Sequence, residues 1–305
     1  MAELSGVLLV DKPEGPTSHD MVALARRLLG TRRIGHAGTL DPLATGLLIL
    51  MIGKATRLAP FLSGADKTYR GIVRLGIATD TYDRGGSPVG DPCEARVDRG
   101  ALLDAIERFR GTIQQRPPVY SAKKVRGTPM YRLARRRKPV EPLPTTVTFK
   151  RIDLLGLVGD EVEIEAEVSA GTYLRSFAHD LGQVLGCGAH LKTLRRVASG
   201  PFLVADAMPP RDLEAIGSRA AERVIPIEEV PLGLPTLQLS AAGCHAIRHG
   251  RLCQIGEVLS PRLPLPPGRC RLQGPQGMLV GIGEVEIQPP PASRPIIRPQ
   301  IVFPT

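Results

Sequence analysis

The chain has 305 residues, of which 42% are hydrophobic and 4% aromatic, and its formal net charge is +10. This composition supports a folded core of mainly aliphatic side chains, and the length suits one large domain or two ordinary ones. The apolar runs are all shorter than the ~18 residues needed to span a bilayer, which excludes a membrane-spanning helix. The basic balance indicates a polyanionic partner, either nucleic acid or an anionic membrane surface. Because residues 1–6 lack the basic region of a signal peptide, we expect a soluble cytoplasmic protein.

The five cysteines are odd in number and widely spaced, which argues against a disulfide framework. Cys244, His245, His249 and Cys253 have the four-residue gaps that place metal ligands on one helix face. No Cys-x-x-Cys pair accompanies them, so zinc is disfavoured and we predict no metal.

The first elements are a buried strand and an amphipathic helix. The run Val-Leu-Leu-Val at residues 7–10 predicts the strand, which ends at Asp11-Lys12-Pro13. Ser18 is the predicted N-cap of a helix that continues to about Leu29 and stops at Gly30.

Residues 35–48 form a glycine-rich segment with one carboxylate and read Gly-His-Ala-Gly-Thr-Leu-Asp-Pro-Leu-Ala-Thr-Gly-Leu-Leu. Pro42 fixes its own φ and pushes Asp41 out of the helical region, so Asp41 should be extended on a stiff loop. On the residues alone, the segment is a turn in which Asp41 accepts backbone N–H bonds. A Walker phosphate loop is excluded because Thr39 follows Gly38 where lysine is required.

Residues 67–76 alternate between apolar and polar side chains, which predicts a strand with Tyr69 on one face and Arg70 on the other. On sequence alone, a tyrosine in this position is a half-buried core residue. In the following turn, Asp80 and Asp83 either bind a cation or, more commonly, cap their own backbone.

Two further elements follow from hydrophobic spacing. Leu102, Leu103, Ile106 and Phe109 predict a helix that ends at Gly111. Residues 161–168 alternate strictly, which predicts a strand with valine, isoleucine and alanine inward and four glutamates outward. The acidic edge would repel phosphate, so a nucleic acid would approach another face.

Residues 123–138 contain eight cations and no acid, with Tyr131 interleaved. The cations are Lys123, Lys124, Arg126, Arg132, Arg135, Arg136, Arg137 and Lys138. They indicate either a solvated surface helix or a segment whose charge is neutralised by RNA phosphates.

Several segments, in the same order along roughly residues 5–205, resemble the TruB family of tRNA pseudouridine synthases. Residues 35–48 resemble its long signature, and the further matches are Lys67 and Tyr69 with residues 79–86, then residues 117–135, 169–176 and 188–196. The resemblance implies that Asp41 is the nucleophile that isomerises uridine 55 in the T arm of tRNA. It implies that Tyr69 stacks on the flipped base and accepts a proton. Arg175, which alone reads as a surface arginine, is implied to pair with Asp41 and keep it ionised.

The resemblance also implies substrate contacts from several other segments, with His36 holding the arm while the target base is turned out. The implied substrate-binding residues are Lys12, His36, Gly38, Thr39, Tyr120, Lys124, Arg135, Leu191 and Leu194. From its own context, Lys12 is a solvated lysine at a strand end, and His190 is structural rather than catalytic.

The implied fold is α+β: a pseudouridine synthase fold with a mixed, mainly antiparallel central sheet flanked by helices. We expect a catalytic domain at residues 1–229, with a basic RNA-binding insertion at about 123–146. After about residue 229, proline-rich segments and short apolar runs predict a small β-rich domain at 230–305, which resembles a PUA RNA-binding module. Residues 289–298 read as a loose linker, and a monomer is expected.

Pseudouridine formation needs no cofactor, because the reaction has no net redox change and no group donor. It needs a carboxylate, a base and a dry pocket that retains the detached uracil. A second interpretation is an RNA chaperone that uses the same basic surface, and both activities can coexist. A third, a hydrolase that uses Asp41, lacks any supporting Gly-x-Ser-x-Gly, His-Glu-x-x-His or paired-carboxylate motif.

Overall fold

The computed structural model describes residues 4–121, 123–125, 127–130, 142–260, 267–288 and 295–303. The chain divides into two compact units. The larger contains Leu9–Leu50 and Ala59–Ala220, and the smaller contains Met1–Leu8, Met51–Leu58 and Ala221–Thr305. No described helix is both long and apolar enough to cross a bilayer.

A ten-stranded mixed sheet has the order β14-β1-β3-β12-β4-β11-β10-β7, with β13 beside β12 and β2 beside β3. Its strands are β1 (Gly6–Lys12), β2 (Ile34–His36), β3 (Thr45–Ile52), β4 (Lys67–Leu75), β7 (Gly111–Gln115), β10 (Thr145–Val158), β11 (Glu161–Val168), β12 (Ala189–Ser199), β13 (Phe202–Leu203) and β14 (Ile225–Pro226). The β3–β12 pair is parallel, whereas β4 pairs antiparallel with both β11 and β12. Two short hairpins pair β5 (Ala78–Thr79) with β6 (Pro88–Val89), and β8 (Lys124–Val125) with β9 (Thr128–Pro129).

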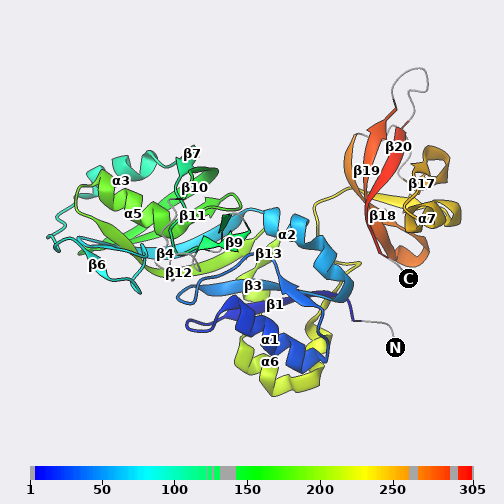
Figure 1. The fold of residues 1–305 in the computed structure, drawn as a ribbon, viewed down its shortest axis with the longest axis horizontal. Coiled ribbons are helices and arrows are strands. Elements are labelled where there is room, and N and C mark those ends of the chain that lie inside the picture. The colour runs from blue at the N-terminus through cyan, green and yellow to red at the C-terminus, as the bar shows by residue number, and fades with distance from the viewer. Residues whose placement is uncertain are drawn as a thin grey trace. The chain divides into compact units, whose positions relative to one another are not determined.

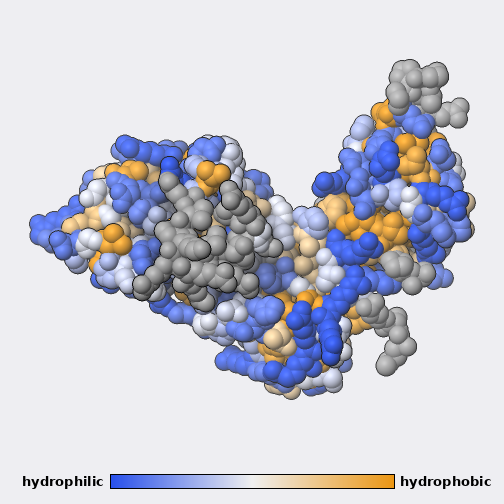
Figure 2. Space-filling model, in the orientation of Figure 1, coloured by the Kyte–Doolittle hydropathy of each residue, from blue (hydrophilic) through white to orange (hydrophobic). Residues whose placement is uncertain are grey.

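Helices cover this sheet. They are α1 (Ser18–Leu29), α2 (Ala59–Gly64), α3 (Arg99–Glu107), α5 (Leu174–Val184) and α6 (Pro210–Ile216), with 3-10 turns at Gly53–Leu58, Val204–Asp206 and Gly217–Arg223. Helix α5 packs against β4 and β12, and α3 packs against α5 and β10 (Figure 1). In the view of Figure 2, the surface of the larger unit is mainly hydrophilic, with scattered hydrophobic residues.

The alternating patterns of β4 and β11 are confirmed. Tyr69 is buried and Arg70 is exposed, and in β11 Val162 and Ile164 are buried while Glu163 is exposed. Period-two alternation determines these faces locally, because successive side chains of a strand point to opposite sides of the sheet.

Three sequence-based boundaries are wrong. Thr17, not Ser18, caps α1, because the Thr17 hydroxyl accepts from the backbone N–H of Asp20 while the Asp20 carboxylate accepts from that of Thr17. Helix α3 ends at Glu107, and Leu103 is 44% exposed rather than part of its buried face. Residues 295–298, read as part of a linker, belong to strand β20 (Pro295–Val302), where they pair with β19.

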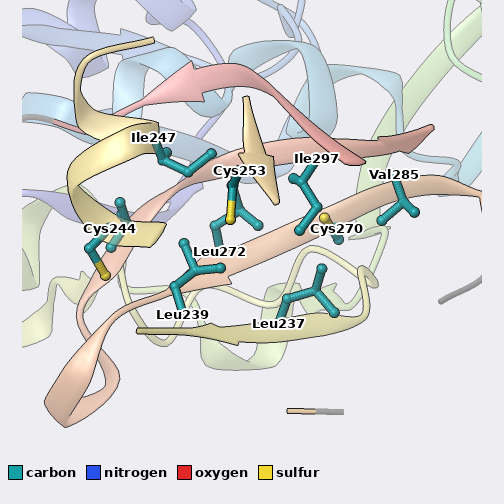
Figure 3. Close-up of a cluster of buried hydrophobic side chains, with 10 residues drawn as sticks. Leu237, Leu239, Cys244, Ile247, Cys253, Cys270, Leu272, Val285 and Ile297 are labelled. Carbon is teal, nitrogen blue, oxygen red and sulfur yellow. The ribbon is translucent and has the colours of Figure 1, made fainter. Parts of the chain in front are cut away.

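The C-terminal residues of the smaller unit form a second sheet of order β16-β20-β19-β18-β15-β17. Its other strands are β15 (Thr236–Leu239), β16 (Cys253–Gln254), β17 (Val258–Ser260), β18 (Gly268–Gln273) and β19 (Leu279–Ile287), accompanied by helix α7 (Ala241–Arg248) and 3-10 turns at Ile255–Glu257 and Pro275–Gly277. Figure 3 shows the core beneath it, where Cys244, Cys253 and Cys270 lie among leucine, isoleucine and valine side chains. The predicted α+β class, with a mainly antiparallel mixed sheet and a β-rich C-terminal part, is confirmed.

Gly46 is required where β3 passes β12. Its φ is +97°, and a Cβ there would lie 2.3 Å from the carbonyl oxygen of Arg196. Gly46→Ala should therefore lower the free energy of unfolding by at least about 2 kcal/mol, because the backbone must shift as well as adopt a strained φ. Gly15→Ala is the matched control, since Gly15 has φ +104° and a Cβ on it would meet nothing within 4 Å, and it should lose only about 1 kcal/mol. Equal losses in denaturant melts would contradict the close-approach explanation.

Candidate active site

A stiff loop presents Asp41 between β2 and β3. The Ser18 hydroxyl, at the start of α1, accepts from the Leu40 backbone N–H at 2.8 Å and donates to the Leu40 carbonyl at 3.0 Å. The backbone N–H of Ala44 donates to the Asp41 carbonyl at 3.0 Å, so the predicted turn is present. The Asp41 carboxylate itself, however, extends to a partner from α5.

Lys12 contacts the same loop, and its ammonium group is hydrogen-bonded to backbone carbonyls. Its side chain is fully buried, and its ammonium donates to the carbonyls of Pro13 and Pro16, both at 2.8 Å, and of Pro42 at 3.4 Å. Burial lowers the pKa of Lys12 to about 8, although the nearby Asp41 carboxylate counteracts this shift. The reading of Lys12 as a solvated lysine is therefore wrong, because its side chain is buried and its ammonium binds three backbone carbonyls beside the Asp41 loop. Its contact with RNA stays a prediction.

The N-terminus of α5 is fixed by β7 and by aromatic packing. The Gln115 side chain accepts from the Tyr173 backbone N–H at 2.8 Å and donates to the Tyr173 carbonyl at 3.1 Å. Phe177, one turn into α5, is fully buried and packs against Phe109 and Phe149, with ring centroids 5.0 and 5.5 Å away. Because both ends of this first turn are held, the side chain of Arg175 between them has a defined direction.

Arg175 is buried and pairs with Asp41, with Nε 2.9 Å from Oδ2. Its Nη1 and Nη2 donate to the carbonyls of Thr81 at 3.1 Å and Tyr120 at 2.9 Å, and Nη1 lies 3.4 Å from the Asp83 carboxylate. The ion pair that the resemblance implies is thus formed, and the reading of Arg175 as a surface arginine is wrong. Carbonyl and carboxylate partners on every side satisfy the guanidinium, as a buried charge requires.

Burial raises the pKa of the Asp41 carboxyl above its usual range, and the Asp83 carboxylate adds to this effect. The Arg175 guanidinium and then the Lys12 ammonium act in the opposite direction. The Asp41 side chain is still 36% exposed, whereas that of Arg175 is 5% exposed. Arg175 thus orients the carboxylate and opposes its protonation without lowering its pKa below the ordinary value, which corrects the simpler expectation from the ion pair.

A cavity of about 460 Å³ opens beside Asp41, within the larger unit. Five of the predicted site residues line it with the carboxylate: Gly38, Thr39, Tyr69, Arg175 and Leu194. Tyr173 and Pro117 add further apolar wall. A volume of this size lies within the range of about 300–1,000 Å³ that small-ligand pockets occupy.

Two cations that sequence reasoning did not assign to the site also line this cavity, Lys67 and Arg196. Lys67 is 6% exposed and its ammonium donates to the carbonyls of Ser63 at 2.6 Å and Ala65 at 2.5 Å. Arg196 is 1% exposed and donates to the carbonyls of Leu47 at 2.7 Å and Gly38 at 3.1 Å. Period-two alternation placed Lys67 on the same face as Tyr69 and was a signal that could have found it.

Three further predicted residues, Leu191, Tyr120 and His36, are not among the residues that line the cavity. Leu191 is a fully buried core residue, and His190 is structural, with its Nδ1 2.9 Å from the Ile77 carbonyl. Tyr120 is 36% exposed and contributes its carbonyl to Arg175. His36 is half-buried, and burial lowers its pKa. The side chain of Lys124 and the whole of Arg135 lie outside the described residues, as does most of the basic segment.

The turn before β6 supports Arg175 through an unusual backbone. Tyr82 has φ +65°, a conformation that bulky residues rarely adopt, and its ring stacks on His179 of α5 with centroids 3.9 Å apart. Asp83 follows it and accepts from the Thr81 hydroxyl at 2.8 Å and the Gly85 N–H at 3.0 Å, while Asp80 accepts from the Ser87 N–H at 2.8 Å. Asp80 and Asp83 therefore cap their own backbone, as predicted, and Asp83 also faces Arg175.

Within the described ranges, no three His, Cys, Asp or Glu side chains cluster as a metal site would require. Cys244 and Cys253 are buried in the smaller unit's core, while His245 and His249 contact each other, with ring centroids 4.2 Å apart. The four side chains whose spacing suggested a zinc site therefore do not share one face: the two cysteines are in the core and the two histidines are on the surface.

Comparison with solved structures defines the class of protein. The chain is similar to a chain of an H/ACA RNP bound to a substrate RNA containing 2′-deoxyuridine, with TM-score 0.74 and 26% identity, over 98% of this chain and 85% of that one. A chain of a Cbf5-Nop10-Gar1 complex gives TM-score 0.73 and 27% identity, over 98% and 84%. Together with the site, these similarities define a pseudouridine synthase fold.

Sequence comparison gives the family. Residues 26–174 match the TruB family pseudouridylate synthase N-terminal domain, and residues 175–230 match the tRNA pseudouridylate synthase B C-terminal domain. The tRNA pseudouridine synthase B of Solibacter usitatus is 47% identical over 81% of this chain and 85% of its own length, and that of Pseudomonas paraeruginosa is 41% identical over 97% and 96%. The chain belongs to the TruB family of pseudouridylate synthases.

Proposed function

We propose that this protein converts uridine 55 in the T arm of tRNA to pseudouridine, with Asp41 as the nucleophile. The observation that supports this most directly is the 2.9 Å pair of Asp41 with buried Arg175 at a cavity of about 460 Å³. The names of the relatives, tRNA pseudouridine synthase B, agree with tRNA as the substrate.

The reaction breaks the N1–C1′ bond of uridine, turns the uracil and joins its C5 to C1′. Asp41 either attacks C1′ through a carboxylate oxygen or removes a proton from C2′, and both roles need the ionised form. Arg175 fixes the direction of the carboxylate. Tyr69, 9% exposed in the cavity wall, stacks on the base and accepts the C5 proton after the new bond has formed.

The target base must leave the folded T loop before it can enter the cavity, at a cost of a few kcal/mol. Gly38, Thr39 and Leu194 form the wall that receives it. His36, in the strand just before the Asp41 loop, helps to hold the T arm with the base turned out. The cavity is hydrophobic on the Leu194 and Tyr173 side, which keeps the detached uracil from exchanging with solvent.

We assign the catalytic domain to residues 1–229 and a PUA-like RNA-binding domain to residues 230–305. Tyr120, Lys124, Arg135 and the basic segment to about residue 146 contact the RNA backbone. We also propose a secondary role as a tRNA-folding chaperone, in which binding alone helps the T arm to form. The Asp41→Asn protein would retain this chaperone activity.

The test is release of tritium from a T-arm stem-loop labelled at uracil C5. We expect stoichiometric release from the target uridine and none when that nucleotide alone is replaced by cytidine carrying the same label. Release that is independent of the target position would contradict the assignment to uridine 55. If the T arm released no tritium and another RNA did, that other RNA would be the substrate.

Neutralising Arg135, Arg136 and Arg137 together should weaken RNA binding and flatten its salt dependence. Each lost phosphate contact removes about 0.7–0.9 from the slope of log K against log salt, because fewer counterions are released. The measurement is a titration of binding between low and moderate salt, with Arg211 and Arg219 to glutamine as a control for net charge. An unchanged slope would place the RNA on another surface.

A further inference from the structure

Lys67 and Arg196 lie on adjacent strands, next to the tyrosine that lines the cavity. In the β4–β12 register, Arg196 is directly opposite Tyr69, and Lys67 is two residues from Tyr69 on the same face. Gly38 lies beside both cations, because a Cβ on it would be 3.4 Å from Nη1 of Arg196 and 3.8 Å from Cε of Lys67. The two positive charges therefore flank the place where the base-stacking ring and the Asp41 loop meet.

Backbone carbonyls, rather than carboxylates, hold both cations. In the part of the chain that the structure describes, no carboxylate forms an ion pair with Lys67 or Arg196, and their hydrogen bonds go to backbone carbonyls. Asp66, the acid next to Lys67, pairs instead with the exposed Lys150. Two buried like charges held only by carbonyl dipoles are unfavourable in the free protein, so the arrangement suits a negative charge that develops in the cavity during the reaction.

The reaction creates such a charge inside the cavity. When the N1–C1′ bond breaks heterolytically, both electrons of the bond leave with the uracil, whose negative charge spreads from N1 to O2 and O4. C1′ regains an electron pair from an Asp41 carboxylate oxygen or from the C2′–H bond as Asp41 takes that proton. On rejoining, C5 supplies the pair to C1′ while the Asp41 oxygen leaves C1′ with its own pair, or while Asp41 returns the proton to C2′. C5 then loses its proton and N1 gains one, so no oxidant or reductant is required.

We propose that Lys67 and Arg196 form a cationic subsite that stabilises the uracil anion while it is detached from the ribose. This inference rests on the proposed function and gives these two residues a direct catalytic role in it. Their burial favours the base over a backbone phosphate as the ligand, because a flipped base enters the cavity while its phosphates stay near the entrance.

The protonation of Lys67 is consistent with this role. Burial and then the Arg196 guanidinium lower the pKa of Lys67 to about 8, while Asp66 counteracts them. Lys67 therefore remains mostly protonated at neutral pH and is a stronger proton donor than an ordinary lysine, which suits a ligand with developing negative charge. Fixed donors of this kind typically contribute about 10²–10³-fold to the rate.

The experiment measures the single-turnover rate and the RNA dissociation constant separately, for Lys67→Met, Lys67→Arg and wild type. We expect Lys67→Met to lower the rate about 100-fold and to change the dissociation constant by less than about threefold, because the anion exists only during the reaction. Lys67→Arg should recover at least about tenfold of that loss. Lys150→Met, which removes a nearby exposed lysine outside the cavity, is the matched control and should keep the wild-type rate.

A second substrate tests the charge itself. Fluorine at C5 withdraws electrons and stabilises the uracil anion, so replacing the target by 5-fluorouridine should shrink the Lys67→Met defect by about tenfold or more. Nuclease digestion and chromatography report loss of the N-glycoside for both bases. An equal loss of rate in Lys67→Met on both bases would overturn the proposal. A larger RNA dissociation constant with an unchanged rate would also overturn it and would indicate that Lys67 contacts a phosphate. Wild-type turnover on the T arm tests the proposed function separately. The ratio of the Lys67→Met rate to the wild-type rate can be measured on any uridine-containing RNA that the wild type isomerises.

Discussion

Asp41→Asn is expected to reduce pseudouridine formation by about 10⁴-fold or more, while tRNA binding stays within a few-fold of wild type. The amide keeps the shape of the side chain but supplies neither a nucleophilic oxygen nor a base, and such a loss is typical of removing a nucleophile. The half-exposed position of Asp41 predicts little loss of stability, although Arg175 loses one charged partner. Tritium release under single-turnover conditions and a binding titration measure the two quantities. Substantial turnover by the purified variant would contradict the nucleophile assignment.

The pH profile of kcat/KM provides an independent check on the same residue. Because burial raises the pKa of Asp41, the active ionised form is lost as the pH falls through a value above the ordinary aspartate range. We therefore expect an acid limb at higher pH than an exposed aspartate would give. An acid limb at or below the ordinary aspartate pKa would show that Arg175 and Lys12 outweigh burial.

Arg175→Met should have the second large effect and should impair both stability and activity. It leaves Asp83, which is 8% exposed, and Asp41 facing each other without their shared cation. Removing one partner of a buried pair typically lowers the free energy of unfolding by about 3 kcal/mol, which corresponds to a Tm lower by roughly 6–12 °C. We also expect the rate to fall by about 100-fold, because Asp41 is no longer directed and its pKa rises further.

Arg175→Lys separates the two roles of the guanidinium. It retains a charge but cannot reach Asp41 and the carbonyls of Thr81 and Tyr120 together, so it should recover more stability than activity. The stability deficit of Arg175→Met should also diminish at low pH, where the Asp41 carboxyl is protonated. A methionine variant as stable and active as wild type would mean that neither carboxylate depends on this cation.

The local parts of the site could be predicted from the sequence. Pro42 and the glycines around Asp41 determine a stiff loop, and alternation in β4 determines that Tyr69 points inward with Lys67. The long motif at residues 35–48 and the ordered matches after it indicated the family, because their length makes chance similarity improbable. The capping error at Thr17 is similarly local: both Thr17 and Ser18 are good caps, and only the reciprocal bond with Asp20 distinguishes them.

Other features depended on contacts between distant segments. Arg175 has no sequence signal of burial, and it is buried because Gln115 and Phe177 dock the start of α5 where Asp41, Asp83 and two carbonyls surround the guanidinium. The register of β4 and β12 likewise brings Arg196 opposite Tyr69, and the carbonyls of three prolines accept hydrogen bonds from the buried Lys12. The sequence by itself thus determined the family, the inward strand faces and the stiff loop that carries the Asp41 carboxylate. Only the tertiary structure decided which cations surround that carboxylate, because the free energy of burying a charge depends on partners that the chain order does not reveal.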